Sequence, residues 1–394
     1  MVKDPNGTKL EFVYGKDLRD LSGKAASNLV NWSYAACKDF LGKEDDNTMN
    51  VFIGCVASEG APSIYVSRFD EDLGKLSVMQ SYSELSKSAY VTMDSKHNLI
   101  YVVGMEGAGT GFAVSYAYDP GTASLRLISK QATLGANPNY VSADPSFTML
   151  FAANYGGETI SVLPLKPGGS IDSVSRCIFH EGSSIVIGPQ NTSHPHCILP
   201  DPSNRFAIVA DLGTDLIYFY RIDHVNHDLA LERTQPIAPG SGPRHLIFHH
   251  AMSFAYMINE LSSTIIVYKY DASVCALKDL QTISTLPEGF NGVSKCADIQ
   301  LSQCGNFVYG TNRGHDSIVV YKVNGDGTLV YLEHVSSGGE KPRSIAVSPD
   351  GRFLLATNEG SNQVVTFAIH PSGKLELAER LDLQSAPICI KFIP

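Results

Sequence analysis

Hydrophobic and polar residues alternate over short stretches along most of the chain, and each stretch ends at a turn signal. From about residue 50 onward, runs such as TIIVYKY (264–270) and SIVVYKV (317–323) are separated by Gly, Pro, Asp or Ser clusters such as SPDG and GDGTL. A two-residue period is typical of a β-strand with one buried face. The pattern therefore predicts an all-β structure for this part of the chain.

The alternating stretches are organised as a repeat. Segments that resemble KPRSIAVSPDGRFLLATN recur at intervals of 45 to 57 residues, and each full unit contains four short strands. The second residues of the aligned units are Ser88, Pro138, Pro195, Pro243, Cys296, Pro342 and Pro387. Four-stranded repeats of this length indicate a β-propeller.

The two ends of the repeat region complete each other. Six units are complete, while the last stops after one strand and the first begins with what resembles a second strand. Residues 386–392 are therefore expected to pair with residues 50–56, which closes the ring and removes exposed strand edges. The predicted fold is a seven-bladed β-propeller over residues 49–394.

Residues 1–48 differ from the repeats and are predicted to form a short N-terminal extension. They lack clean strand alternation, and residues 26–42 are compatible with one helix. Trp32, the single tryptophan of the chain, also lies in this segment.

Composition narrows the classes of function. Thirty Lys and Arg against 40 Asp and Glu give a net charge of −10, which disfavours a nucleic-acid backbone as partner. No apolar run approaches the roughly 20 residues that span a bilayer, and the N-terminus lacks a signal-peptide pattern. None of the eight cysteines forms a CxxC pair, so we expect reduced thiols in a cytoplasmic protein without membrane contact.

The repeat register predicts where charged side chains gather. In a propeller blade, the start of the first strand and the end of the second lie on the same rim of the channel. The residues that the register places there are His196, Arg244, Glu260, Arg313, Arg343 and Glu359, with His245, Asp298 and His315 close by in sequence. We expect these side chains to converge on one solvated face.

Their chemistry suits an anionic substrate. Arginines bind carboxylate or phosphate in a bidentate manner, and His and Glu transfer protons near neutral pH. The bland alternative is a structural ion-pair network in a binding or scaffold propeller. No metal or cofactor is expected, because cationic arginines can take the place of a Lewis acid.

The same residues carry a family resemblance. The motifs SHPH, DLGTD, GPRH, NEL, NRGHDSI and PRSIAVSPDGRFLLATNEGSNQV resemble those of the seven-bladed lactonase propellers. That family includes propeller-type 6-phosphogluconolactonase and the 3-carboxy-cis,cis-muconate lactonizing enzyme. The resemblance covers the chain from about residue 50 and implies that His196, Arg244, Glu260 and Arg313 are catalytic.

The leading hypothesis is hydrolysis of a small anionic sugar lactone of the 6-phosphogluconolactone kind, a reaction of carbohydrate metabolism. Arg244, Arg313 and Arg343 would clamp the anion and stabilise the oxyanion, while either Glu260 or His196 would activate water. Residues expected to bind substrate are Arg343, His245, His315 and Glu359.

Two alternative functions remain open. The first is a cycloisomerase that forms a lactone from carboxymuconate, a polycarboxylate that arginines would also bind. The second is a non-catalytic binding module. We also expect the long loop from Glu181 to His194 to overhang the entrance as a lid.

Overall fold

The computed structural model describes residues 2–3, 9–10, 47–107 and 109–393. They belong to two compact units, Met1–Asn47 and Thr48–Pro394. In the first unit, β1 (Val2–Lys3) pairs antiparallel with β2 (Lys9–Leu10). The helix expected over residues 26–42 lies outside the described residues.

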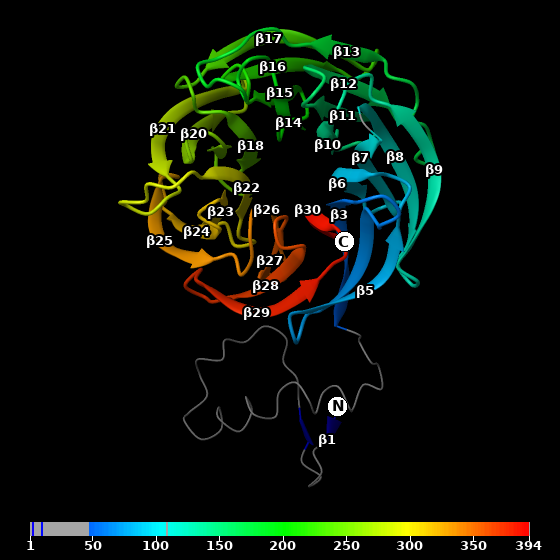
Figure 1. Ribbon diagram of the computed structural model, residues 1–394, viewed down its shortest axis with the longest axis vertical. Coiled ribbons are helices and arrows are strands. Elements are labelled where there is room, and N and C mark those ends of the chain that lie inside the picture. Colours follow the sequence, from blue (N-terminus) through cyan, green and yellow to red (C-terminus); the bar gives the residue numbers. More distant parts are fainter. Residues whose placement is uncertain (1, 4–8, 11–46, 108, 394) are drawn as a thin grey trace. The chain divides into compact units, whose positions relative to one another are not determined.

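The second unit is a ring of seven four-stranded antiparallel blades, so the predicted all-β, seven-bladed propeller is confirmed (Figure 1). The first and the closing blade are joined into one eight-stranded sheet by a bridge between Val56 and Lys87. Blade 1 consists of β6 (Lys87–Asp94), β7 (Leu99–Glu106), β8 (Thr110–Asp119) and β9 (Ser124–Ala132). Blade 2 consists of β10 (Pro138–Ala143), β11 (Met149–Asn154), β12 (Thr159–Pro164) and β13 (Arg176–Phe179). Blade 3 consists of β14 (Pro195–Pro200), β15 (Phe206–Asp211), β16 (Leu216–Asp223) and β17 (Asp228–Pro236). Blade 4 consists of β18 (Pro243–Phe248), β19 (Phe254–Asn259), β20 (Thr264–Asp271) and β21 (Ala276–Ser284). Blade 5 consists of β22 (Lys295–Leu301), β23 (Phe307–Arg313), β24 (Ser317–Val323) and β25 (Leu329–Ser336). Blade 6 consists of β26 (Pro342–Val347), β27 (Phe353–Asn358), β28 (Gln363–Ile369) and β29 (Leu375–Asp382).

The closing blade joins the two ends of the repeat region. It consists of β30 (Ala386–Ile393), β3 (Thr48–Val56), β4 (Ile64–Asp70) and β5 (Lys75–Tyr82). β30 pairs antiparallel with β3 from Asn50–Ile393 to Val56–Ala386, which is the pairing expected from the repeat. Because each end strand completes the other's sheet, the ring closes through backbone hydrogen bonds.

Burial along the strands follows their position in a blade. All six residues of β11 and all six of β27 are buried, because these second strands lie between neighbouring blades. The outermost strands, such as β29, alternate between partly covered and exposed residues. This difference explains why the second strand of each repeat is a nearly continuous apolar run while the fourth strand alternates.

Neighbouring blades are also joined through the Gly-x-Leu turns. The hydroxyl of Tyr256 donates to the carbonyl of Gly327 in the next blade over 3.2 Å, and Tyr309 donates to Gly373 over the same distance. Both glycines have positive φ, and a Cβ at Gly327 would lie 2.5 Å from the ring of Phe254. The turns therefore require glycine for their backbone conformation and for their fit against the adjacent blade.

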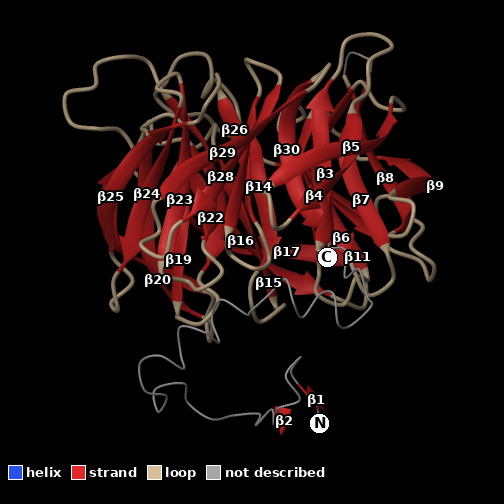
Figure 2. Cartoon of the chain, turned by 90° about the horizontal axis from the view of Figure 1, so that it is seen from below, coloured by secondary structure: helices blue, strands red, loops and turns tan. Residues whose placement is uncertain are grey.

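Seen from the side, the strands run between two ends of the ring, and the connecting loops gather at those ends (Figure 2). No helix that could cross a bilayer occurs among the described residues.

Candidate functional site

A β-bulge interrupts the innermost strand of every blade at the same repeat position. In blade 3, for example, Pro195 pairs with Asp211 and Cys197 with Ala210, so His196 has no partner in the ladder. The residues left unpaired in this way are Ala89, Asn139, His196, Arg244, Ala297 with Asp298, Arg343 and Ile388. A bulge redirects the extra side chain, and here it presents a ring of residues at one end of the central channel.

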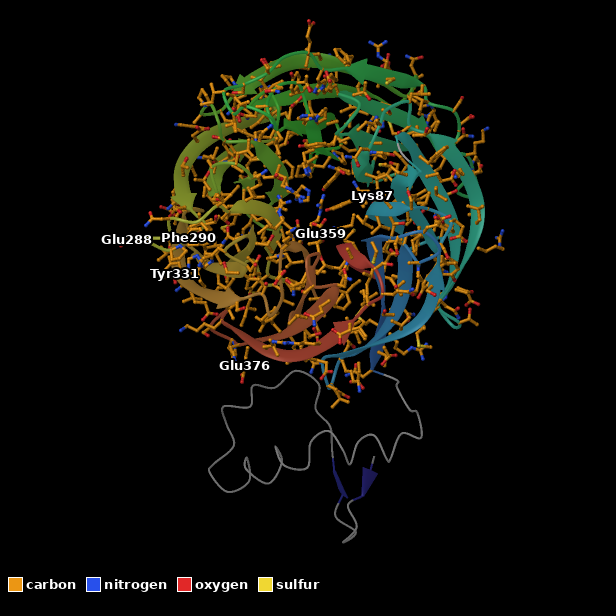
Figure 3. All side chains as sticks on the ribbon, viewed as in Figure 1. Lys87, Glu288, Phe290, Tyr331, Glu359 and Glu376 are labelled. Carbon is orange, nitrogen blue, oxygen red and sulfur yellow. The ribbon has the colours of Figure 1, made fainter. Side chains whose placement is uncertain are left out.

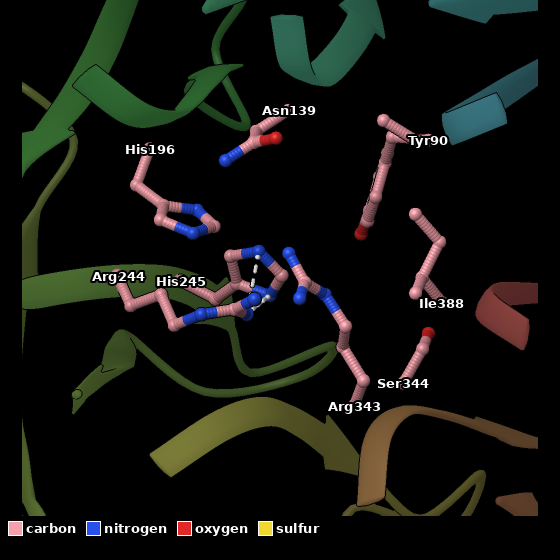
Figure 4. A pocket seen from close by; sticks show the side chains of 9 residues that line it. Tyr90, Asn139, His196, Arg244, His245, Arg343, Ser344 and Ile388 are labelled. Carbon is pink, nitrogen blue, oxygen red and sulfur yellow. Dashed lines mark hydrogen bonds between the residues drawn. The ribbon is translucent and has the colours of Figure 1, made fainter. Parts of the chain in front are cut away.

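Six of these bulge residues line one small pocket. They are joined there by Tyr90, His245 and Ser344. The side chains of His196, Arg244 and Arg343 point toward one another across the pocket (Figure 4). The pocket has a volume of about 10 Å³, which is close to the space that one water molecule needs.

One carboxylate joins two of the predicted arginines. Glu260 Oε2 accepts from Arg244 Nε at 3.0 Å and from Arg313 Nη2 at 2.7 Å. Burial acts to raise the pKa of Glu260, but Arg313 and Arg244 outweigh it and hold that pKa below its usual value. Glu260 therefore stays ionised and fixes both guanidinium groups.

A second ion pair lies beside the first. Arg343 Nη1 donates to Glu359 Oε2 at 2.9 Å, and both side chains are partly exposed. Burial acts to raise the pKa of Glu359, but Arg343 outweighs it and lowers the pKa. This carboxylate is also ionised, so two acidic and three arginine side chains form the charged mouth of the pocket.

The two histidines of the pocket are neutral. Burial, reinforced by Arg244, lowers the pKa of His196 well below its usual value and that of His245 to about 4. His196 is 3% exposed, and its Nδ1 has no hydrogen-bond partner among the described residues. A neutral imidazole with an unused nitrogen can accept a proton.

Asp298 supports the pocket from deeper in the channel. It accepts from His245 Nδ1 at 2.9 Å, from Ser344 Oγ at 3.1 Å and from the Ile345 amide at 3.0 Å. Burial acts to raise the pKa of Asp298, but the hydrogen bonds, led by that from His245, lower it to about 2. With His245 neutral, its other nitrogen faces Arg244 Nη1 at 3.2 Å, so the carboxylate orients the ring and the ring contacts the arginine.

The structure brings together eight of the nine residues that the sequence placed at this end of the channel: His196, Arg244, His245, Glu260, Asp298, Arg313, Arg343 and Glu359. His315 lies apart from this pocket. Its Nδ1 is 2.7 Å from Ser317 Oγ, and its ring packs edge-on against Phe290 and His334. The contact with His334 on β25 places His315 against the outer strand of its blade rather than over the channel.

The expectation of a solvated rim is wrong for its central residues. Arg244 is 3% exposed and Glu260 is 8% exposed. Seven blades converge on a narrow channel, so side chains that would be exposed on a single blade are covered by those of the others. Removing one of these buried charged groups would leave its partner as an unpaired buried charge, so each group stabilises the other.

Among the described residues, no group of three or more His, Cys, Asp or Glu side chains is arranged to hold a metal ion.

Comparison with known proteins agrees with this architecture. Residues 50–392 match the family model described as lactonase, 7-bladed β-propeller. The chain belongs to this family. A 6-phosphogluconolactonase of Bacillus subtilis is 31% identical over 297 residues, which cover 74% of this chain and 83% of that protein. A 6-phosphogluconolactonase of Formosa agariphila is 30% identical over 289 residues, covering 71% and 81% respectively.

The solved structure of a periplasmic gluconolactonase from Pseudomonas aeruginosa superimposes with a TM-score of 0.83 at 31% identity. The match covers 88% of this chain and 99% of that one. The seven-bladed lactonase fold is therefore shared over nearly the whole propeller.

One cationic side chain near the pocket, Lys87, was not predicted from the sequence. Lys87 begins β6, and its Nζ donates to Asn137 Oδ1 at 2.5 Å and to Asn139 Oδ1 at 3.0 Å. Burial and the nearby Arg343 lower its pKa to about 7. Lys295 and Lys341 occupy the same repeat position and are exposed, so the sequence contained no signal that set Lys87 apart.

The two aspartates of the DLGTD motif, Asp211 and Asp215, hold neighbouring loops through hydrogen bonds. Asp211 accepts from Ser193 Oγ at 2.6 Å and from the His194 amide at 2.8 Å. Asp215 accepts from the amides of Gly240 and Gly242, both at 2.6 Å. The first carboxylate thus holds the loop that leads into His196, and the second holds the loop that leads into Arg244.

The loop from Glu181 to His194 enters β14 at the end of the channel where His196 lies. Ser184 Oγ donates to Asp215 at 2.6 Å, which ties the loop to its own blade. Its apolar side chains Ile185 and Ile187 are exposed. The pocket itself is lined by other residues, and a role of this loop as a lid stays a prediction.

Proposed function

We propose that this protein hydrolyses a small anionic sugar lactone of the 6-phosphogluconolactone kind. Two relatives named 6-phosphogluconolactonase align with most of the propeller. The observation that carries the proposal is the arrangement at Glu260, where one carboxylate orients Arg244 and Arg313 beside the neutral His196.

Arg244 and Arg313 are placed to stabilise the oxyanion. Attack of water on the lactone carbonyl creates negative charge on its oxygen, and donors that are already oriented stabilise that charge without reorganisation. Glu260 accepts from both guanidinium groups, the Ala297 carbonyl accepts from Arg244 Nη1 and the Cys296 carbonyl accepts from Arg313 Nη2. The other N–H groups of both side chains would be available to the substrate. Arg313 Nε, for instance, is buried without a partner among the described residues.

His196 is the better candidate for the base that activates water. Glu260 Oε2 already accepts from two arginines, which makes the carboxylate a weak proton acceptor. Burial and Arg244 lower the pKa of His196, which keeps the ring neutral but weakens it as a base. It is favoured because its Nδ1 has no partner among the described residues and it borders a cavity with room for about one water molecule. It would take a proton from that water as the C–O bond forms.

The same proton completes the reaction. The tetrahedral intermediate collapses with cleavage of the ring C–O bond, and imidazolium His196 gives its proton to the departing hydroxyl. Water is consumed, and a hydroxy acid is released. Glu260 remains ionised throughout and acts by holding Arg244 and Arg313.

Initial rates of lactone opening, measured above the uncatalysed rate, test this function. The wild type is expected to open 6-phosphoglucono-δ-lactone, His196→Asn to lose turnover by about 10²–10⁴-fold, and Glu260→Gln to lose turnover because the arginines are released. Cyclisation of carboxymuconate by the wild type in place of lactone opening would instead assign the cycloisomerase reaction. No turnover of either substrate would favour a binding module.

A further inference from the structure

One cation at the mouth of the pocket has no part in the mechanism above. Lys87 Nζ is held by the side-chain oxygens of Asn137 and Asn139, and Asn139 itself lines the pocket. No carboxylate lies within ion-pair distance of Lys87 among the residues that the structure describes. Figure 3 shows Lys87 and Glu359 bordering the central channel.

This arrangement is unfavourable for the unliganded protein. Arg244 and Arg343 both lie near enough to repel a charged Lys87, and Glu359 offsets them in part. A lysine turned to solvent would avoid this repulsion, and Lys295 at the same repeat position is exposed. A cation that is retained among other cations indicates an anion that binds there.

The charge count at the mouth suits a dianion. The cations are Arg244, Arg313, Arg343 and protonated Lys87, and the ionised carboxylates are Glu260 and Glu359. With Lys87 protonated, these six groups carry an excess of two positive charges, although the whole chain is acidic. Deeper in the channel, Asp298 and Lys391 offset each other.

We propose that Lys87 and Arg343 form a phosphate subsite that binds the end of the substrate distal to the lactone. The proposal rests on the proposed lactonase function and assigns the side chains that would select a phosphorylated lactone over an unphosphorylated one. Arg343 offers a planar donor edge and Lys87 a point charge, a combination that suits the oxygens of a phosphate monoester. Arg244 and Arg313 remain with the reacting carbonyl.

The subsite couples binding to protons. Burial and Arg343 lower the pKa of Lys87 to about 7, Arg244 acts in the same direction, and Glu359 acts against them. Asn137 and Asn139, the groups in direct contact, are uncharged. In the free protein, Lys87 is therefore only partly protonated at neutral pH, and a bound phosphate would favour its protonated form. Affinity for phosphate is expected to fall as the pH rises above about 7.

Selectivity between two lactones is the first test. Wild type, Lys87→Met, Lys87→Arg and the matched control Lys295→Met are compared on 6-phosphoglucono-δ-lactone and glucono-δ-lactone. Lys87→Met should lower kcat/KM for the phosphorylated lactone about 10- to 100-fold, the loss of one charge-assisted hydrogen bond, mainly through KM. For the unphosphorylated lactone it should change kcat/KM less than about threefold.

Two further features separate a binding role from a structural one. In the wild type, the preference for the phosphorylated lactone should fall as the pH rises from about 7 to 8. Lys87→Arg should keep the preference and lose this pH dependence, because arginine does not titrate in that range. Lys295→Met should behave as wild type. Equal losses on both lactones, or no loss on either, would overturn the subsite.

Calorimetric titration with inorganic phosphate tests the subsite without turnover. In two buffers of different ionisation enthalpy at pH 7, the wild type should take up more protons on binding than Lys87→Met does. Inorganic phosphate itself titrates near this pH and contributes the same proton change in both proteins, so the difference between them reports on Lys87. If neither lactone is opened but phosphate binds with this difference in proton uptake, the proposed function fails and the subsite stands. If lactones are opened but phosphate binding is the same in Lys87→Met, the subsite fails alone.

Discussion

The two ends of the central channel are built from the same seven inner strands, yet they differ in chemistry. At the end where those strands begin, the pocket is lined by His196, Arg244 and Arg343 and has a volume of about 10 Å³. Toward the other end, a chamber of about 250 Å³ is lined mainly by apolar residues such as Phe248 and Leu301. Tyr90 and His245 border both cavities and separate them.

The difference follows from the regularity of the strands. Beyond the bulge the ladder is regular, as from Cys197–Ala210 to Pro200–Ala207 in blade 3, and the strand keeps its apolar pattern. At the bulge the ladder is interrupted and a side chain turns into the channel. Charged chemistry therefore gathers where backbone pairing is broken, while the regular part of the same strands builds the scaffold.

The largest effect is expected at the boundary between the two ends. Asp298→Ala should lower the free energy of unfolding by about 3–5 kcal/mol, because His245, Ser344 Oγ and the Ile345 amide lose a buried acceptor. Urea unfolding at pH 7 measures this, with Asp326→Ala on an exposed turn as control.

The pH dependence of Asp298 has a defined sign. Its pKa in the folded protein is lowered to about 2, so it stabilises the fold above the unfolded value near 4. That contribution should be lost in the wild type as the pH falls from about 4 to 2, and the mutant should lack this loss. If Asp298→Ala lowered the free energy of unfolding at pH 7 by less than about 1 kcal/mol, Asp298 would not be the acceptor that stabilises the boundary between the two ends.

The charged end of the channel should respond to loss of an arginine, and the opposite end should not. Arg244→Met is expected to lower turnover of the lactone about 10²–10³-fold, the usual cost of one oxyanion donor. The control is Arg352→Met in the turn at the other end of blade 6, where the arginine pairs with Asp350. Similar rates in the two variants would show that the charged pocket is not the reacting site.

A smaller effect is expected from the loop that leads into Arg244. Asp215→Asn should lower kcat/KM about tenfold, because an amide oxygen and an NH₂ group cannot both accept from the Gly240 and Gly242 amides. Asp223→Asn, in a turn at the other end of blade 3, is the control. Unchanged kinetics with a lowered unfolding midpoint would limit Asp215 to a structural role.

The smallest effect should come from the apolar chamber. Lys391 Nζ lies 5.1 Å from the centre of the Tyr90 ring and lines the apolar chamber, not the charged pocket. Lys391→Met is expected to change kcat/KM less than about twofold in steady-state assays. A tenfold change would mean that the two ends act as one site.

Most of the fold could be predicted from the sequence because its signals are local and repeated. The alternation, the turn glycines and the spacing of the units predict four-stranded blades, and the incomplete units at residues 50 and 386 predict the closure seen between β3 and β30. The register also placed Arg244, Arg313 and Glu260 on one rim. Each of these inferences needs a pattern along the chain and no knowledge of distant neighbours.

Tertiary structure decided the properties that depend on several blades at once. Lys87, Lys295 and Lys341 share one repeat position, but Asn137 and Asn139 of the next blade hold only the first of them at the pocket. In the same way, His315 was predicted at the site and lies against His334 instead. Burial, ion pairing and pKa depend on which side chains meet across the channel, so the sequence set the candidates and the closed ring determined their environment.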